Sequence, residues 1–465
     1  MAPCRSSTSV WSALLLAREA RKMACSVVRS PVLRNPTVRH YAAAVAAQRS
    51  CAAAPETQVL SNKIAVATVD NNNPVTQVSI VFRAGSRNET YDTQGLVHHL
   101  RIATGLGTCN SSSFGIISTI QQLGGTITTT TDRESIAYTL QVTRNHLDKA
   151  LPVLEQVATQ QLFKPWEVSD QIPRLRYELS TIPETTRLME LLHKAAYQDG
   201  LGYSLYCPKR QLGKLNMESL QHFVNNWFTG SRCAVVATGV PLSDLSSFAA
   251  SLKVGTEDKA AQAAKYHGGE MRKERTSELS SVAVAVEAIG FNDRKNALVC
   301  AILQRAVGSG PRVKWGAGVS PLHKAVSSAG SADQFAISAY NAVYSDSSLY
   351  GFVLSTVPSL AGSLTKAATA YLRSPQLSDA DVARGKALLK AEIAFVADND
   401  AATLENMGVQ LLFMGKMYNT PKFIEEVDKI TASEVKSVAA KIGGGKLSMA
   451  AIGDLATVPY IEELK

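Results

Sequence analysis

The order of strand-like and helix-like segments in this chain occurs twice, about 200 residues apart. The paired segments, each named by its first residue, are VSIVFRAGSR at Val78 and VAVAVEAIGF at Val282, LRIATGLGT at Leu100 and LQRAVGSGP at Leu303, and QLGGT at Gln122 and SAGSA at Ser328. Their offsets are 204, 203 and 206 residues. Such steady spacing between weakly similar segments is typical of a duplicated domain. The chain is therefore expected to fold as two similar halves.

Within the first copy, strand-like and helix-like segments follow one another closely. The expected elements are strands at 63–70 and 75–86, helices at 98–103 and 114–123, a strand pair within 126–143 and an amphipathic helix at 147–161. Because they lack the strict rhythm of a parallel sheet, we predict an α+β fold of two homologous domains. We place these domains at residues 54–252 and 274–465, joined by a polar, Gly-containing linker at 253–273.

Positive charge is concentrated in the first 50 residues. Of the formal net charge of +9, eight basic residues against the single acid Glu19 place +7 in this segment and leave +2 for the rest. An Arg-, Ala- and Ser-rich segment almost free of acids is typical of a mitochondrial transit peptide, and Arg39, three residues before Ala42, predicts a leader of residues 1–41. The run WSALLLA suggests a secretory signal instead, but basic residues continue after it.

The remainder of the chain excludes several other classes of protein. Being nearly neutral, it lacks the basic surface of a nucleic-acid-binding protein, and it has no apolar run of about 18 residues that could span a membrane. The seven cysteines are widely spaced without a C-x-x-C pair, and no P-loop or dinucleotide-binding glycine motif follows a strand. We predict no cofactor, and cysteines that are buried free thiols.

The segment LVHHLRIATGLGT, residues 96–108, comes closest to a metal-binding pattern. A zinc peptidase helix of the form H-x-x-E-H presents two histidine ligands on one face, with a glutamate that deprotonates the bound water. With His98 placed first, Arg101 stands at the glutamate position and Ile102 at the second histidine position. A permanent cation opposes metal binding, and Ile102 offers no lone pair.

We therefore predict neither catalytic residues nor a metal site in this segment. His98 is expected to be a buried or half-buried histidine bonded to the backbone. His99 is expected to face solvent or an interface.

Together with the duplication, these residues resemble the pitrilysin-type metallopeptidases and the mitochondrial processing peptidase group. The resemblance rests on FRAGSRNET, residues 82–90, and on GLVHHLRIATGLGT, where an active member reads close to G-x-x-H-x-L-E-H followed by a Gly-Thr pair. In that family a further glutamate ligand follows later, seven residues after a supporting glutamate, and Gln171 and Glu178 stand at those places. The resemblance implies two pitrilysin-like domains in which His98 and Glu178 keep the family's chemistry. The same comparison implies that Arg101, Ile102 and Gln171 have lost it.

Later segments resemble the non-peptidase core subunits of ubiquinol–cytochrome c reductase, respiratory complex III, within this group. They are GSGPRVKWG from Gly308, AISAYNAVYSDSSLYGFVLS from Ala336 and KLSMAAIGDLATVPYIEEL from Lys446. This resemblance implies a non-catalytic subunit that supports assembly and stability of the complex, peripheral to the mitochondrial inner membrane on its matrix side. The implied partners are core protein 1, cytochrome b, cytochrome c1 and the iron-sulfur subunit, with membrane association through these partners and no nucleic acid.

An alternative within the same family is the α-subunit of the mitochondrial processing peptidase. That subunit also lacks the metal motif, and it binds presequences for its active partner. It is expected to carry a long glycine-rich loop in its second half. The segment GSGPRVKWGAG, residues 308–318, is short and has four glycines in eleven residues, which favours the complex III interpretation.

Overall fold

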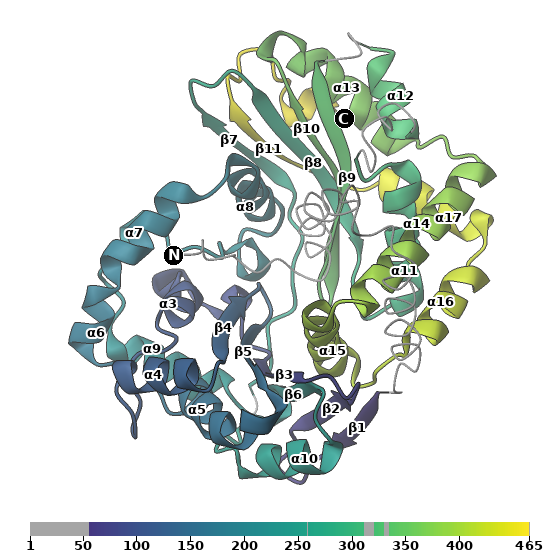
Figure 1. The fold of residues 1–465 in the computed structure, drawn as a ribbon. Helices are drawn as coiled ribbons and strands as arrows, with labels where there is room; N and C mark the ends of the chain where they lie inside the picture. The colour runs from purple at the N-terminus through teal and green to yellow at the C-terminus, as the bar shows by residue number, and fades with distance from the viewer. Residues whose placement is uncertain (1–54, 258, 311–319, 330–333, 465) are drawn as a thin grey trace, which may run out of the picture.

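Two mixed β-sheets, each flanked by helices, make up the protein (Figure 1). The structure is a computed structural model that describes residues 55–257, 259–310, 320–329 and 334–464. The predicted leader at residues 1–41 and most of the segment GSGPRVKWGAG lie outside the described residues. The fold is α+β, as predicted.

Apart from one extra strand, the two sheets have the same strand order. The first sheet runs β1-β2-β6-β3-β5-β4 and the second β7-β11-β8-β10-β9. Their strands are β1 (Glu56–Val59), β2 (Ala65–Val69), β3 (Val75–Phe82), β4 (Thr126–Thr131), β5 (Ile136–Thr143), β6 (Cys233–Thr238), β7 (Gly269–Glu274), β8 (Ser280–Ile289), β9 (Phe335–Val343), β10 (Ser347–Thr356) and β11 (Leu447–Gly453). The pairs β2–β6 and β7–β11 are parallel, and all other pairs are antiparallel. This correspondence confirms the duplication predicted from the repeated segments.

Side-chain alternation in the two central strands keeps the same offset. In β3, Val78 points toward the helices of its own half, whereas Val81 points to the opposite face of the sheet. In β8, 204 residues later, Val282 and Ala285 point in the corresponding two directions. Since a shift of one residue would exchange the two faces of a strand, the duplication preserves register as well as strand order.

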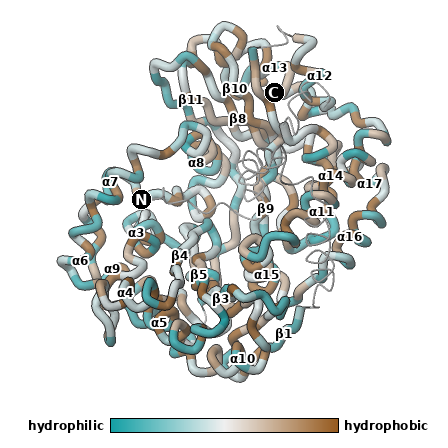
Figure 2. Tube along the Cα trace, viewed as in Figure 1, coloured by the Kyte–Doolittle hydropathy of each residue, from teal (hydrophilic) through white to brown (hydrophobic). Residues whose placement is uncertain are grey.

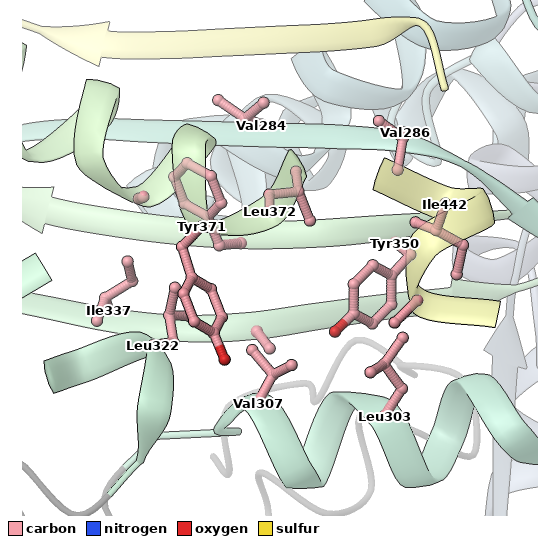
Figure 3. Packing of buried hydrophobic residues seen from close by; sticks show 14 of the residues in the cluster. Val284, Val286, Leu303, Val307, Leu322, Ile337, Tyr350, Tyr371, Leu372 and Ile442 are labelled. Atoms are coloured by element: carbon pink, nitrogen blue, oxygen red, sulfur yellow. The ribbon is translucent and has the colours of Figure 1, made fainter. Parts of the chain in front are cut away.

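Most helices cover one face of the sheet in their own half. Those of the first half are α3 (Leu96–Ile102), α4 (Ser113–Gln122), α5 (Leu147–Thr159), α6 (Pro165–Asp170), α7 (Ile172–Thr181), α8 (Glu184–Tyr197), α9 (Met217–Trp227) and α10 (Leu242–Ser251). Those of the second half are α11 (Arg294–Val307), α12 (Pro321–Ser327), α13 (Pro358–Arg373), α14 (Asp379–Ala397), α15 (Asp400–Met414), α16 (Thr420–Lys429) and α17 (Ala432–Gly443). Figure 2 shows hydrophobic residues along the inner strands of both sheets. In the second half, Val284 and Val286 of β8 pack in one cluster with Leu303 and Val307 of α11 (Figure 3).

Two helices are exchanged between the halves. Helix α8 belongs to the first half in sequence, but its Leu188 and Leu192 pack against Ala283 and neighbouring residues of the second sheet. Conversely, Leu404 of α15 packs against Val236 and its neighbours in the first sheet. Each sheet is therefore covered on its second face by a helix from the other half (Figure 1).

Two expectations differ from the structure. The linker predicted at 253–273 is too long at its end, because Gly269–Glu274 pairs with β11 as an edge strand of the second sheet. Its charged sequence GEMRKE is typical of an edge strand, which composition alone does not distinguish from a linker. The expectation of buried thiols holds for Cys207, Cys233 and Cys300 but is wrong for Cys109, which is exposed. None of the helices in the described residues is both long and apolar enough to cross a membrane.

Candidate functional site: a peptidase helix without its metal ligands

A buried carboxylate holds the start of helix α3, which carries the degenerate motif. Glu89 accepts hydrogen bonds from the backbone N–H groups of Gly95 and Val97, each at 2.8 Å. These N–H groups lie at the positive end of the helix and would otherwise be without partners. Gly95 has a φ of +93°, and a Cβ there would lie 2.6 Å from the Cα of Cys207, so this position requires glycine. The segment FRAGSRNET thus positions the motif helix through its glutamate.

His98 is fully buried and bonded through both ring nitrogens. Nδ1 accepts the backbone N–H of Cys207 at 3.1 Å, and Nε2 lies 3.0 Å from Oε2 of Glu178. Since Nδ1 is the acceptor, the proton is assigned to Nε2, which donates to Glu178. Burial, together with the nearby Arg101, lowers the pKa of His98, although the Glu178 carboxylate opposes this change. The predicted buried histidine with a backbone partner is therefore found, with Glu178 as a second partner.

Arg101 occupies the space beside His98 and pairs with the same carboxylate. Its guanidinium donates to Oε2 of Glu178, and the side chains of Arg101 and Glu178 are 8% and 14% exposed. Arg174 of α7 lies 3.7 Å from the other carboxylate oxygen. Burial alone would raise the pKa of Glu178, but hydrogen bonds from His98 and Arg101 and the charge of Arg101 lower it to about 2. Glu178 is therefore an ionised partner of Arg101 rather than a free metal ligand.

Ile102 fills the second histidine position with hydrocarbon. It is 2% exposed and packs with Leu175 of α7, Cys207 and Leu212. No group of three His, Cys, Asp or Glu side chains that could hold a metal ion is present in the described part of the chain. The residues at this site do not fit the zinc ion of the related peptidases, because one ligand position is apolar and a guanidinium stands next to the others.

The structure also shows where Gln171 and His99 lie. Gln171 lies between α6 and α7, two turns before Glu178, and its carbonyl oxygen accepts the N–H of Leu175 at 3.0 Å. The expectation that His99 faces solvent or an interface is wrong, since His99 is 4% exposed and its Nδ1 is 2.8 Å from the carbonyl oxygen of Gly95. The motif helix has buried residues on all sides, so no face of it is left for solvent.

A second cluster of polar residues, which the motif search did not identify, joins the two halves. Arg87 lies 2.6 Å from Glu134 in the first half, and its guanidinium forms a two-pronged bond with Asp346 in the second half, at 2.8 and 2.5 Å. Glu134 also accepts the N–H and the hydroxyl of Ser345, at 2.8 and 2.6 Å. We call Arg87, Glu134, Ser345 and Asp346 the junction cluster.

Two residues of the junction cluster, Ser345 and Asp346, lie in the stretch YSDSSLYGF, residues 344–352, which is part of one of the segments that resemble the complex III core subunits. The first residues of this stretch form the turn between β9 and β10. Two more of them, Tyr344 and Ser347, contact the exchanged helix α8. Tyr344 Oη lies 2.7 Å from Nε2 of His193, and the hydroxyl of Ser347 lies 2.9 Å from Oη of Tyr197. The stretch could be singled out in the sequence, but the residues that it contacts could not, because they lie about 150 to 260 residues away along the chain.

Family models match both halves of the chain. Residues 65–209 match the model described as Insulinase (Peptidase family M16), and residues 214–389 match the model described as Peptidase M16 inactive domain. The chain belongs to peptidase family M16.

Curated proteins of two kinds are similar to this chain along most of its length. The protein named Cytochrome b-c1 complex subunit 2, mitochondrial, of Homo sapiens is 33% identical over 446 residues, which cover 92% of this chain and 98% of the relative. The protein of the same name in Rattus norvegicus is 34% identical over a stretch that covers 87% of this chain and 91% of the relative. The Arabidopsis thaliana protein named Probable mitochondrial-processing peptidase subunit alpha-1, mitochondrial, is 25% identical over a stretch that covers 87% of this chain and 83% of the relative.

Proposed function

We propose that this chain is a non-catalytic core subunit of ubiquinol–cytochrome c reductase, respiratory complex III, and an inactive homologue of the M16 metallopeptidases. The observation that carries the proposal is the similarity of 33–34% along about nine-tenths of the chain to proteins named Cytochrome b-c1 complex subunit 2. The chemistry of the motif helix agrees with it, because Arg101 and Ile102 occupy the positions that a zinc centre requires.

In this proposal the chain provides contact surfaces for other subunits and catalyses no reaction. Two enzyme-like domains serve to assemble and stabilise the complex, with core protein 1, cytochrome b, cytochrome c1 and the iron-sulfur subunit as partners. The word mitochondrial in the names of the relatives, together with the acid-poor first 41 residues, supports import and removal of a leader. We place the mature chain on the matrix side of the inner membrane, bound through its partners.

Copurification tests this proposal. Membranes from mitochondria that carry an affinity-tagged copy of the full chain are solubilised gently, and the tagged protein is isolated. Cytochrome b and cytochrome c1 are expected to elute with it in equal amounts, identified by their haem spectra. Elution without either cytochrome, under conditions in which the two cytochromes stay together, would contradict the proposal.

The second candidate is a presequence-binding α-subunit of a processing peptidase. The 25% identity to an Arabidopsis protein of that name favours it, although less than the higher identity to the complex III relatives. In this case the tagged chain elutes in a heterodimer free of cytochromes, and that heterodimer cleaves a synthetic presequence. The two functions therefore predict different partners in the same experiment.

A further inference from the structure

We propose that four cations beside edge strand β7 form a binding surface for an acidic segment of a partner polypeptide. The four residues are Lys273, Arg275, Arg187 and Lys209, and we call them the β7 cation cluster. The proposal goes beyond the function proposed above and does not depend on it.

The β7 cation cluster draws on both halves of the chain. Lys273 lies in β7 and Arg275 directly follows this strand, two residues apart, so their side chains leave on the same side. Arg187 lies in the first turn of α8, and Lys209 begins the short helix η6 (Lys209–Gln211). Helix α8 packs directly on β7, and Figure 1 shows α8 beside β7, with α7 further to the left.

The positive charge of this cluster is not neutralised within the protein. Among the described residues, no carboxylate forms an ion pair with any of the four cations. Arg187 donates instead to the carbonyl oxygens of Leu179 and Ile182, at 2.8 and 3.1 Å, which fixes its guanidinium at the end of α7 without cancelling its charge. Lys273 and Lys209 are exposed, so an external anion can reach them.

The backbone N–H of His267, just before β7, donates to the carbonyl oxygen of Ala196 at 2.7 Å, so the last turn of α8 lies at the start of β7. The first turn of α8, with Arg187, therefore lies toward the end of β7 that carries Lys273. Partial burial lowers the pKa of Lys273, and the charges of Arg275, Arg187 and Lys209 lower it further. Like charges held this close repel one another, and an incoming carboxylate would relieve that repulsion.

Positive charge continues from this cluster toward the motif helix. Lys209 follows two residues after Cys207, whose N–H is bonded to His98. Arg174 of α7, whose side chain is half exposed, pairs with Glu178 at 3.7 Å. Glu178, the carboxylate at this place, is also engaged by His98 and Arg101.

The arrangement favours an acidic polypeptide over other ligands. Lys273 is flanked by cations from its own strand end, from α8 and from η6, so a narrow chain with successive carboxylates can reach all four. A basic segment, such as an Arg-rich presequence, would be repelled by the same charges.

Peptide binding to the full mature chain, in the complex with which it purifies, tests the proposal. The probe is a short fluorescent peptide of alternating Glu and Ser, measured by fluorescence anisotropy at low salt. The double variant Lys273→Glu with Arg275→Glu is expected to weaken binding roughly tenfold or more. The milder variant Lys273→Gln with Arg275→Gln is expected to give an intermediate loss. Thermal unfolding checks that both variants are folded.

A matched control reverses two cations elsewhere. Lys149→Glu with Lys441→Glu makes the same change in net charge at two exposed helical positions and is expected to weaken binding less than about twofold. Equal losses in the two charge-reversal variants would overturn the proposal, as would tighter binding of an Arg–Ser peptide than of the Glu–Ser peptide. Binding through Lys273 and Arg275 to phosphatidylglycerol vesicles or to inorganic phosphate, without binding of the Glu–Ser peptide, would also overturn it.

Discussion

Arg101 and Ile102 stand where the resemblance to the peptidases places part of a metal centre, and both make interactions that are common in protein interiors. The guanidinium supplies the positive charge that a metal would have placed beside Glu178, and the isoleucine supplies packing against Leu175. Glu178 remains ionised although burial opposes this, because His98 and Arg101 both donate to it. Glu178 is therefore part of the structural core through its bonds to His98 and Arg101.

The first prediction concerns the pH dependence of this ion pair. The pKa of Glu178 is about 2 in the folded protein against an ordinary value of 4.5, so its contribution to the free energy of unfolding is complete above pH 4.5. The contribution decreases as the pH falls from 4.5 toward 2, and its full size is at most about 3 kcal/mol. Urea unfolding of the wild-type protein and of Glu178→Gln should therefore show a stability difference that narrows over this pH range.

The control for this experiment is Glu278→Gln, at an exposed position in the loop before β8. Its effect on stability should be within about 0.5 kcal/mol. A stability difference for Glu178→Gln that stays constant between neutral and acid pH would show that the carboxylate is not held by His98 and Arg101.

The second prediction concerns zinc. The wild-type protein is expected to purify without stoichiometric zinc, because Ile102 and Arg101 do not fit a zinc site. The variant Arg101→Glu with Ile102→His removes the guanidinium and places an imidazole near His98 and Glu178. It should bind zinc more tightly than Arg101→Glu with Ile102→Ala, as measured by titration calorimetry. A tightly bound zinc ion in the wild-type protein that is lost in His98→Ala would contradict this prediction.

At the scale of single residues, the sequence predicted that His98 is buried with a backbone partner, and the structure shows both. The absence of a metal site at His98, Arg101 and Ile102 stays a prediction. Burial of His99 could not be predicted, because it depends on neighbours that are distant in sequence. The pairing of Arg87 with Asp346 was hidden for the same reason, since 259 residues separate them.

At the scale of whole elements, the hydrophobic patterns of residues 63–161 predicted the strands and helices of that part of the chain. The strand pair within 126–143 and the helix expected at 147–161 correspond to β4, β5 and α5. What the pattern did not predict is the partner of each element. The apolar face of α8, with Leu188 and Leu192, indicates burial against a sheet but not against which of the two sheets. The exchange of α8 and α15 therefore had to come from the structure.

The third prediction follows from this exchange. Residues 54–252 produced alone should bind a hydrophobic dye and associate, because Leu188 and Leu192 then lose the second sheet and the first sheet loses the cover of α15. Coexpression with residues 253–465 should restore a monodisperse, dye-free pair. Size-exclusion chromatography and dye fluorescence measure both effects.

A variant of the isolated first half separates the exposed helix from other causes. Leu188→Ser with Leu192→Ser should reduce dye binding by that half, although the same change would destabilise the full chain by several kcal/mol. If the isolated half is monomeric and does not bind dye, α8 is not the element that needs the second sheet.

At the scale of the whole molecule, the junction cluster joins the two halves through a largely buried guanidinium. The side chain of Arg87 is 8% exposed and that of Glu134 7%. Burial of charges is unfavourable, but each acceptor oxygen in this cluster has a donor, from Arg87, Ser345 or the backbone N–H of Ala264. The cluster therefore connects the two halves while leaving none of its carboxylate oxygens without a donor.

The fourth prediction tests the junction cluster. Arg87→Met leaves Glu134 and Asp346 without their cation and should lower the free energy of unfolding by about 3–5 kcal/mol. Lys436→Met removes an exposed ion pair with Asp379 and should cost less than about 1 kcal/mol. Chemical denaturation of the two variants measures both values. Equal effects would mean that Arg87 does not act as a buried junction residue.

The exchange of α8 and α15 also sets the order in which the parts of this protein can reach their final form. A chain that emerges from its amino end completes α8 roughly 250 residues before the strand β11 that helps to cover it. The first half cannot complete its packing before the second half forms, because its sheet is covered by α15 and its helix α8 packs on β11. The apolar face of α8, with Leu188 and Leu192, therefore stays uncovered until the second sheet forms, and the last third of the chain completes both halves.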